Sequence, residues 1–115
     1  MDLFSEIAFK TSKVITQNYS TSFSGAVSLL EKEKQDAIYS IYGFVRFADE
    51  IVDTFHECNQ SYMLDKFESD LNDAIVEKIS LNPVLHAFSL TIRKYGIDMK
   101  FVDAFLASMR ADLKK

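Results

Sequence analysis

Two aspartates lie four residues apart in the stretch RFADEIVD, which is otherwise largely apolar. At 100° per residue, Tyr42, Arg46, Asp49 and Asp53 fall within about 60° of one another on a helix, because their spacing nearly closes whole turns. The two carboxylates would lie about 6 Å apart along the axis, which suits one or two hard divalent cations. Magnesium is the natural candidate, because it is commonly shared between a few carboxylates and substrate phosphates. Arg46 could hydrogen-bond those phosphates, or simply pair with Asp49 or Glu50.

Apolar residues flank this polar stripe on both sides. One set is predicted to face the core, namely Ile38, Ile41, Val45, Ala48, Val52 and Phe55. A second set lies on the remaining side, namely Phe44, Phe47 and Ile51. A helix that is apolar around most of its circumference is normally buried, and buried carboxylates need compensating cations or hydrogen bonds. The aspartate pair alone would suit a salt-bridged surface, whereas the apolar flanks favour a metal and phosphate site.

Helices should build the rest of the chain, because apolar residues recur at three- and four-residue spacing and only three glycines and one proline interrupt them. The sequence predicts an all-α fold without strands. We expect a break at YSTSFS and helices over about 3–18, 25–30, 32–56, 62–79, 84–95 and from 98 to the end. The stripe of Phe101, Phe105 and Met109 could belong to the core or line a tunnel for an apolar chain.

Composition excludes several classes of function. The net charge is −4 and no basic stripe is present, so nucleic acid is not an expected partner. One cysteine, Cys58, and two histidines, His56 and His86, offer no zinc or thiol chemistry, and we expect His86 on an ordinary helix face. No signal peptide or membrane-spanning run is recognisable, so the expected location is cytoplasmic. The ten phenylalanines indicate an unusually aromatic core or an apolar surface that awaits more chain.

Two segments, YSTSFSGAVSLL and IYGFVRFADEIVDTF, resemble the N-terminal part of the squalene and phytoene synthases, the head-to-head prenyltransferases. The family's serine turn reads here Ser20, Thr21, Ser22 and Phe23. Its Tyr-x-x-x-Arg-x-x-Asp-x-x-x-Asp run reads Tyr42, Arg46, Asp49 and Asp53. The closing ASMRADL resembles a later family helix, which would place Asp112, like Phe23, near the cavity.

This resemblance implies an all-helical bundle of the isoprenoid synthase type that condenses two farnesyl or geranylgeranyl diphosphates. The product would be of squalene or phytoene type, formed through a cyclopropyl diphosphate, with NADPH needed only for a squalene-type product. It implies that Asp49 and Asp53 hold Mg²⁺ or Mn²⁺ and that Tyr42 acts with them in catalysis. The diphosphate would contact Ser20, Ser22, Tyr42 and Arg46. Product release could involve peripheral association with a membrane.

Two departures from the family pattern limit what the resemblance implies. Tyr19 and Thr21 stand where relatives often carry His and Lys, and no second DxxxD follows Asp53. We therefore interpret residues 1–115 as the N-terminal part of a single longer domain, inactive by itself. Two other hypotheses stay open: a non-catalytic helical scaffold with a synthase-like fold, and a hydrolase in which water captures the allylic cation.

Overall fold

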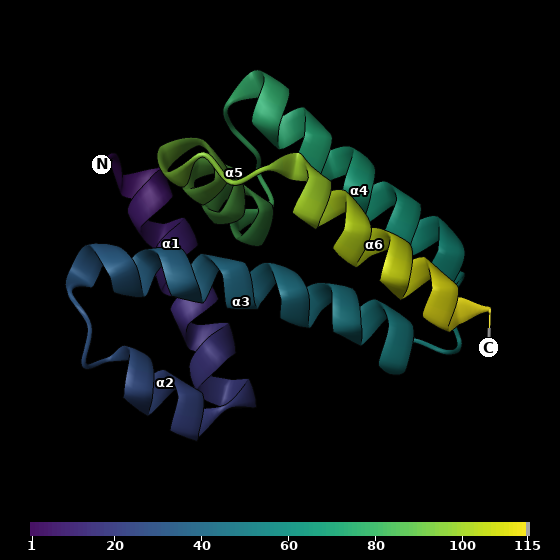
Figure 1. Cartoon of the computed structure of the whole chain (residues 1–115), viewed down its shortest axis with the longest axis horizontal. Helices are drawn as coiled ribbons and strands as arrows, with labels where there is room; N and C mark the ends of the chain where they lie inside the picture. Colours follow the sequence, from purple (N-terminus) through teal and green to yellow (C-terminus); the bar gives the residue numbers. More distant parts are fainter. Residues whose placement is uncertain (115) are drawn as a thin grey trace.

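The computed structural model describes residues 1–114, which form six α-helices and no strand (Figure 1). The all-α prediction is therefore confirmed. The helices are α1 (Leu3–Tyr19), α2 (Thr21–Val27), α3 (Lys32–Asp53), α4 (Gln60–Glu77), α5 (Pro83–Tyr95) and α6 (Met99–Leu113).

The long helix α3 organises the fold. It packs against α1 and α5 along one part of its length and against α4 and α6 along another (Figure 1). The helices α4 and α6 lie side by side, and Arg110 of α6 pairs there with Asp65 and Glu68 of α4. The short α2 contacts mainly α1, which leaves it at the periphery.

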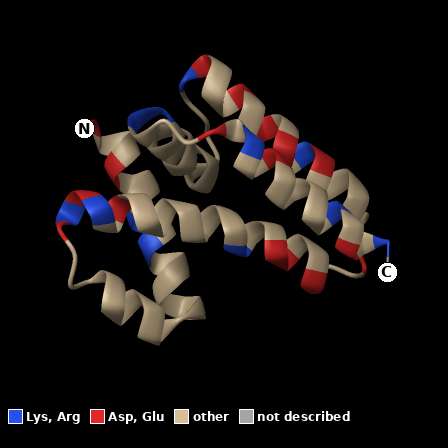
Figure 2. Cartoon of the chain, in the orientation of Figure 1, with Lys and Arg blue, Asp and Glu red and all other residues tan. Residues whose placement is uncertain are grey.

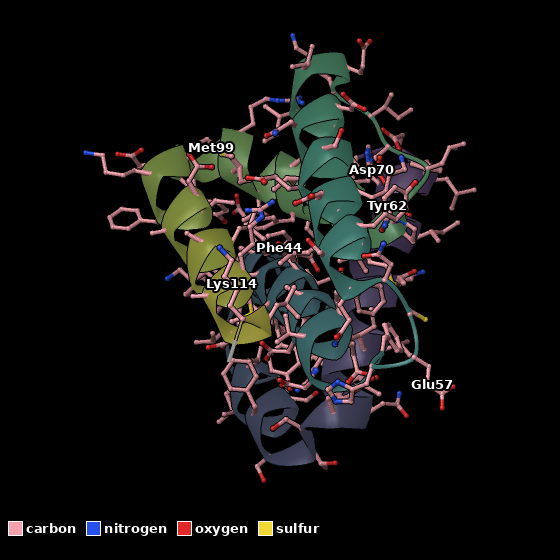
Figure 3. All side chains as sticks on the ribbon, turned by 90° about the vertical axis from the view of Figure 1, so that its right-hand side faces the viewer. Phe44, Glu57, Tyr62, Asp70, Met99 and Lys114 are labelled. Carbon is pink, nitrogen blue, oxygen red and sulfur yellow. The ribbon has the colours of Figure 1, made fainter. Side chains whose placement is uncertain are left out.

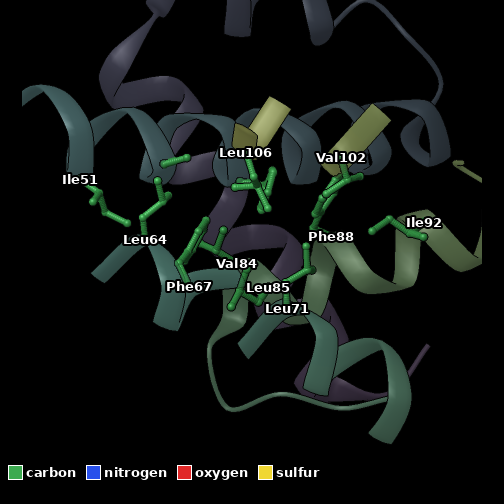
Figure 4. Close-up of a cluster of buried hydrophobic side chains, with 12 residues drawn as sticks. Ile51, Leu64, Phe67, Leu71, Val84, Leu85, Phe88, Ile92, Val102 and Leu106 are labelled. Atoms are coloured by element: carbon green, nitrogen blue, oxygen red, sulfur yellow. The ribbon is translucent and has the colours of Figure 1, made fainter. Parts of the chain in front are cut away.

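The core is centred on Phe44 in the middle of α3. Its ring lies 4.3 Å from that of Phe88, 5.3 Å from Phe67 and 5.8 Å from Phe105, measured between centroids. Those rings come from α5, α4 and α6, so one side chain of α3 contacts three other helices. The side view in Figure 3 shows Phe44 between α4 and α6. Figure 4 shows the buried aliphatic residues that complete this cluster, among them Leu64, Leu85 and Leu106.

The predicted core-facing stripe of α3 was partly wrong. Ala48 and Val52 are buried as expected, but Ile41 is 39% exposed and Phe55 is 38% exposed. Phe44 and Ile51, which were assigned to the remaining side, belong to the core instead. The physical reason is that α4 and α5 pack on the side of Phe44, a choice between two apolar faces that periodicity alone does not make.

Several helix ends also differ from prediction. The expected break over YSTSFS is confined to Ser20, whose backbone N–H donates to Thr16 and whose Oγ accepts from the Phe23 N–H at 3.3 Å. One serine thus closes α1 and caps α2, so α2 begins at Thr21 rather than near Gly25. The helix α3 ends at Asp53, three residues earlier than predicted.

Gly43 lets α1 and α3 approach closely. A Cβ atom at this position would lie 3.3 Å from Ser12 Oγ and 3.6 Å from a methyl carbon of Val84. The contact with Ser12 is tighter than ordinary van der Waals packing, whereas that with Val84 is ordinary, so a larger side chain would push α1 away from α3. This close crossing matters for function because the C-terminal end of α1 carries Tyr19 to the polar stripe of α3.

His86 is a buried structural residue, not the ordinary helix-face histidine that we expected. Its side chain is 3% exposed, and the edge of Phe4 packs against it with ring centroids 4.9 Å apart. Nδ1 accepts the Ser80 N–H at 3.3 Å, so in the neutral ring Nε2 carries the proton and donates to Ser5 Oγ at 2.9 Å. Burial lowers the pKa of His86; Arg93 acts in the same direction and Asp2 opposes it.

This arrangement predicts a pH-dependent stability. Because the pKa of His86 is lower in the folded chain, the unfolded chain binds more protons between the two values, and stability falls as pH drops below about 6.5. Urea denaturation at pH 7.5 and 5.5 should show a loss on the order of 1 kcal/mol for the natural chain. His86→Gln should flatten this difference. His56→Gln, at an exposed position, should preserve it, and an equal flattening in both variants would contradict the assignment.

Candidate functional site

Arg46 is the centre of the polar stripe on α3. Its Nη2 donates to Glu50 Oε1 at 3.1 Å, and its Nη1 lies 3.9 Å from Asp49 Oδ2. The guanidinium also lies over the ring of Tyr19, 4.8 Å from the centroid. The Arg46 side chain is 23% exposed, so its charge is partly removed from water and depends on these neighbours. The two carboxylates belong to α3 itself, whereas the cation–π contact with Tyr19 connects the end of α1 to α3.

One nitrogen of this guanidinium has no acceptor. Nε of Arg46 is buried, and nothing in residues 1–114 accepts a hydrogen bond from it. A buried donor that stays unpaired costs about 1–3 kcal/mol. The arginine consequently retains unused capacity to bind an acceptor such as a phosphate oxygen.

Tyr19 and Glu50 both contact the Arg46 guanidinium, Tyr19 through its ring face and Glu50 through its carboxylate. Partial burial, then the charge of Glu50 and a hydrogen bond to it, raises the pKa of the Tyr19 hydroxyl, whereas Arg46 opposes the rise. Sequence reasoning proposed Glu50 as a partner of Arg46 from its spacing of four residues. It missed Tyr19 as a contact, because nothing in the local pattern shows that the end of α1 reaches α3.

Tyr42 continues the stripe one turn earlier on α3. Its ring stacks on Phe23 of α2, with centroids 5.4 Å apart and planes inclined by 25°. This contact brings the serine turn to the same side of α3 as Arg46. Within the turn, Ser20 Oγ is engaged in capping α2, whereas Ser22 is exposed.

The carboxylates of the stripe differ in their surroundings. The side chain of Asp49 is 31% exposed, and Asp53 at the end of α3 is also exposed. Partial burial raises the pKa of Asp49, and the charges of Asp53, Glu50 and Asp112 add to the rise against the influence of Arg46. Asp112 belongs to α6, and Figure 2 shows acidic residues at the C-terminal ends of both α3 and α6. The folded chain therefore gathers negative charge here.

The donor set suits a hard cation without completing its coordination. Asp49 and Asp53 offer oxygen ligands one turn apart, and oxygen is what Mg²⁺ or Mn²⁺ prefers. Among residues 1–114, however, no group of three or more His, Cys, Asp or Glu side chains is placed to hold a metal ion. The two aspartates could hold a cation only together with water, phosphate or other protein ligands.

Apolar grooves flank the stripe on both sides. The groove between α3 and α6 has a volume of about 250 Å³ and is lined by Ile41, Phe44, Val45, Phe88, Ile97, Phe101, Val102 and Phe105. A groove of about 350 Å³ lies between α3 and α4, and its wall includes Tyr19, Phe47 and Tyr62. Of the stripe of Phe101 and Phe105, Phe105 packs on the core as expected and Phe101 is exposed at the groove, while a role in lining a tunnel for an apolar chain stays a prediction.

The structure brings together most of the predicted site. Tyr42, Arg46 and Asp49 share one side of α3, Phe23 stacks against it, and Asp112 influences Asp49 from α6. In residues 1–114, no contact of Ser22 or Asp53 with the Arg46 side chain is found. The protein is therefore all-helical, with a site that combines Arg46 and several carboxylates beside apolar grooves.

Comparison with known proteins gives the family. The sequence matches the family described as Squalene/phytoene synthase over residues 16–115. It is similar to phytoene synthase 3, chloroplastic, of Zea mays, with 30% identity over 109 residues that cover 94% of this chain and 25% of the relative. Phytoene synthase 1, chloroplastic, of the same plant is 30% identical over 105 residues, covering 88% of this chain and 25% of the relative. The chain belongs to the squalene/phytoene synthase family and spans about a quarter of the length of these relatives.

No helix within residues 1–114 has the length and apolar character needed to cross a lipid bilayer.

The raised pKa of Asp49 predicts a variant that is more stable than the natural chain. The folded state binds more protons between the ordinary and the raised pKa, so stability is lost as pH rises through that window. At pH 7 without divalent cations, Asp49→Asn should increase the free energy of unfolding in urea by on the order of 0.5 kcal/mol. Mg²⁺ should stabilise the natural chain more than the variant.

Asp73→Asn provides the matched control, because Asp73 is an exposed acid on α4 away from the stripe. It should respond to Mg²⁺ like the natural chain. A less stable Asp49→Asn chain at pH 7 would show that the Arg46 contact outweighs the cost of burial.

Proposed function

We propose that the full-length protein carries out a magnesium-dependent, head-to-head condensation of two prenyl diphosphates. The observation that carries the proposal is the juxtaposition of Arg46 and Asp49, which share a partly buried face of α3 beside an apolar groove. A prenyl diphosphate has the same two parts, an anionic head and an apolar tail. Two similar proteins of Zea mays are named phytoene synthases, which supports this proposal.

Arg46 would bind the diphosphate. Its guanidinium contacts Glu50 and the face of the Tyr19 ring. The side chain is therefore already restrained before the ligand binds, and binding loses less conformational entropy than it would with a free arginine. Its unpaired Nε adds a donor that a phosphate oxygen could satisfy. Ser20 and Ser22 would approach the same oxygens from the start of α2, and Tyr42 would approach from α3.

Asp49 and Asp53 would hold Mg²⁺, which when bound supplies the positive charge that stabilises the departing diphosphate. A bound cation would also offset the partial burial and the neighbouring negative charges that raise the pKa of Asp49. Asp112, on the neighbouring helix, would add negative charge on the other side of the site.

The apolar groove between α3 and α6 would receive a prenyl tail. Ile41 and Phe101 at its rim expose apolar surface that a farnesyl or geranylgeranyl chain could cover. Excluding water there would protect the allylic cation until the double bond of the second prenyl chain attacks it. Loss of a proton would close the cyclopropyl diphosphate. Departure of its diphosphate and rearrangement would then give a phytoene-type product by loss of a second proton, or a squalene-type product by transfer of hydride from NADPH.

The test requires the full-length protein. Asp49→Asn and Asp53→Asn should each lower magnesium-dependent turnover of farnesyl or geranylgeranyl diphosphate by about 100-fold or more, because each removes a charge that acts on the leaving group. Asp73→Asn should retain normal turnover. Turnover near the natural level in the two site variants would overturn the assignment.

A non-catalytic scaffold is the second candidate. The exposure of Asp53 and the absence of a third metal ligand in the described part of the chain favour it. Binding of a prenyl diphosphate to the full-length protein, measured with and without Mg²⁺, separates the two: a scaffold should show no magnesium-dependent binding. If binding is found, product analysis distinguishes coupling from hydrolysis, in which water takes the place of the second prenyl chain.

A further inference from the structure

A pocket with a polar lining lies between α1, α2 and the first half of α3, separate from the two apolar grooves. Its volume is about 370 Å³, and its wall is formed by Lys13, Gln17, Thr21, Ser24, Gly25, Ser28 and Tyr39. None of these residues belongs to the stripe around Arg46. In Figure 1 the helix α2 lies at the lower left, apart from the core, below the first half of α3.

Tyr39 provides the first indication that this pocket has an occupant. The residue is 1% exposed, yet its hydroxyl is buried and has no hydrogen-bond partner within residues 1–114. Buried polar side-chain atoms nearly always have a partner in the protein, in water or in a ligand. Because Tyr39 also lines this pocket, a ligand bound there is a candidate partner for its hydroxyl.

Gly25 provides a second, independent indication. It lies inside α2, where glycine is a poor helix former, and its φ is not in the left-handed region. A Cβ atom at this position would meet nothing within 4 Å, so close packing of the protein does not require glycine either. What the missing side chain does provide is free volume at the wall of the pocket.

The lining determines the chemistry of the occupant. Lys13 is the one charged residue in the wall, and no carboxylate accompanies it. The other polar side chains carry four hydroxyls and one amide, and all of these can donate to a ligand except the Ser28 hydroxyl, which donates to the Gly25 carbonyl at 2.6 Å. A cation surrounded by neutral donors complements a compact oxyanion, in contrast to the acid-rich stripe around Asp49, which repels anions until a cation is bound.

We propose that this pocket binds a phosphate group, either inorganic phosphate or diphosphate, through Lys13 and the hydroxyl of Tyr39. The site is separate from the Arg46 stripe and does not depend on the proposed prenyl condensation. Either anion fits the same chemistry, and the two are compared in the test.

The test measures thermal unfolding of the chain in increasing phosphate or diphosphate, with sodium chloride at matched ionic strength as the reference. The natural chain should show a saturable rise in Tm with at least one of the two anions. Lys13→Gln should weaken the apparent affinity about tenfold or more. Lys10→Gln, which removes the same charge from α1 outside the pocket, should leave the affinity unchanged.

Tyr39→Phe distinguishes a binding role from a purely structural one. Without anion, the variant should unfold at the same or a higher temperature, because it loses a buried hydroxyl that has no partner. With anion, it should lose most of the rise in Tm. A lower Tm without anion would overturn the proposal, since it would show that the hydroxyl is already satisfied.

Arg46→Gln serves to locate the anion. It should keep the anion-dependent rise in Tm if binding occurs at Lys13 and Tyr39. Loss of the rise in Arg46→Gln, with the rise retained in Lys13→Gln, would assign the anion to the stripe and overturn the proposal. The same holds if no anion raises the Tm of the natural chain above the chloride reference.

Discussion

The contact between Arg46 and its three neighbours is the constraint on which the site depends. A guanidinium that is only about a quarter exposed needs compensation, and Glu50, Asp49 and the ring of Tyr19 supply it from two helices. The contact to Tyr19 requires α1 to end against α3. That geometry in turn depends on the close crossing at Gly43, where almost no space separates α3 from Ser12. The close backbone packing at Gly43 and the contact between Arg46 and Tyr19 thus both hold α1 against α3.

One side of α3 packs in the hydrophobic core, and another carries the polar stripe at the partly solvated edge. Phe44 stacks with rings from α4, α5 and α6, which anchors the helix in the core. Arg46 and Asp49, about half a turn and one and a half turns further along, lie at the partly solvated edge. Rotation of α3 about its axis would pull Phe44 out of the aromatic cluster. The core therefore holds the polar stripe in one orientation, which a binding site for a charged ligand requires.

Much of this arrangement was predictable from local sequence, and the rest was not for identifiable reasons. Spacing alone placed Tyr42, Arg46 and Asp49 on one face, because helical periodicity is a local property. It could not decide which apolar face of α3 becomes the core, since Phe44 is buried by helices that follow it in the chain. The roles of Tyr19 and His86 also depend on residues far away in sequence, and the roles of Asp53 and Ser22 stay predictions.

The two polar sites differ in the sign of the charge that they must attract first. Around Asp49, partial burial and the charges of neighbouring carboxylates raise the pKa of Asp49, so an anionic ligand can approach only after a cation has neutralised part of that charge. Around Tyr39, the single charge is that of Lys13, so an anion can bind directly. If both proposals hold, phosphate groups would bind on two sides of α2, with and without a metal ion. The short helix α2, capped by Ser20, would then lie between two phosphate sites, one that requires a metal ion and one that does not.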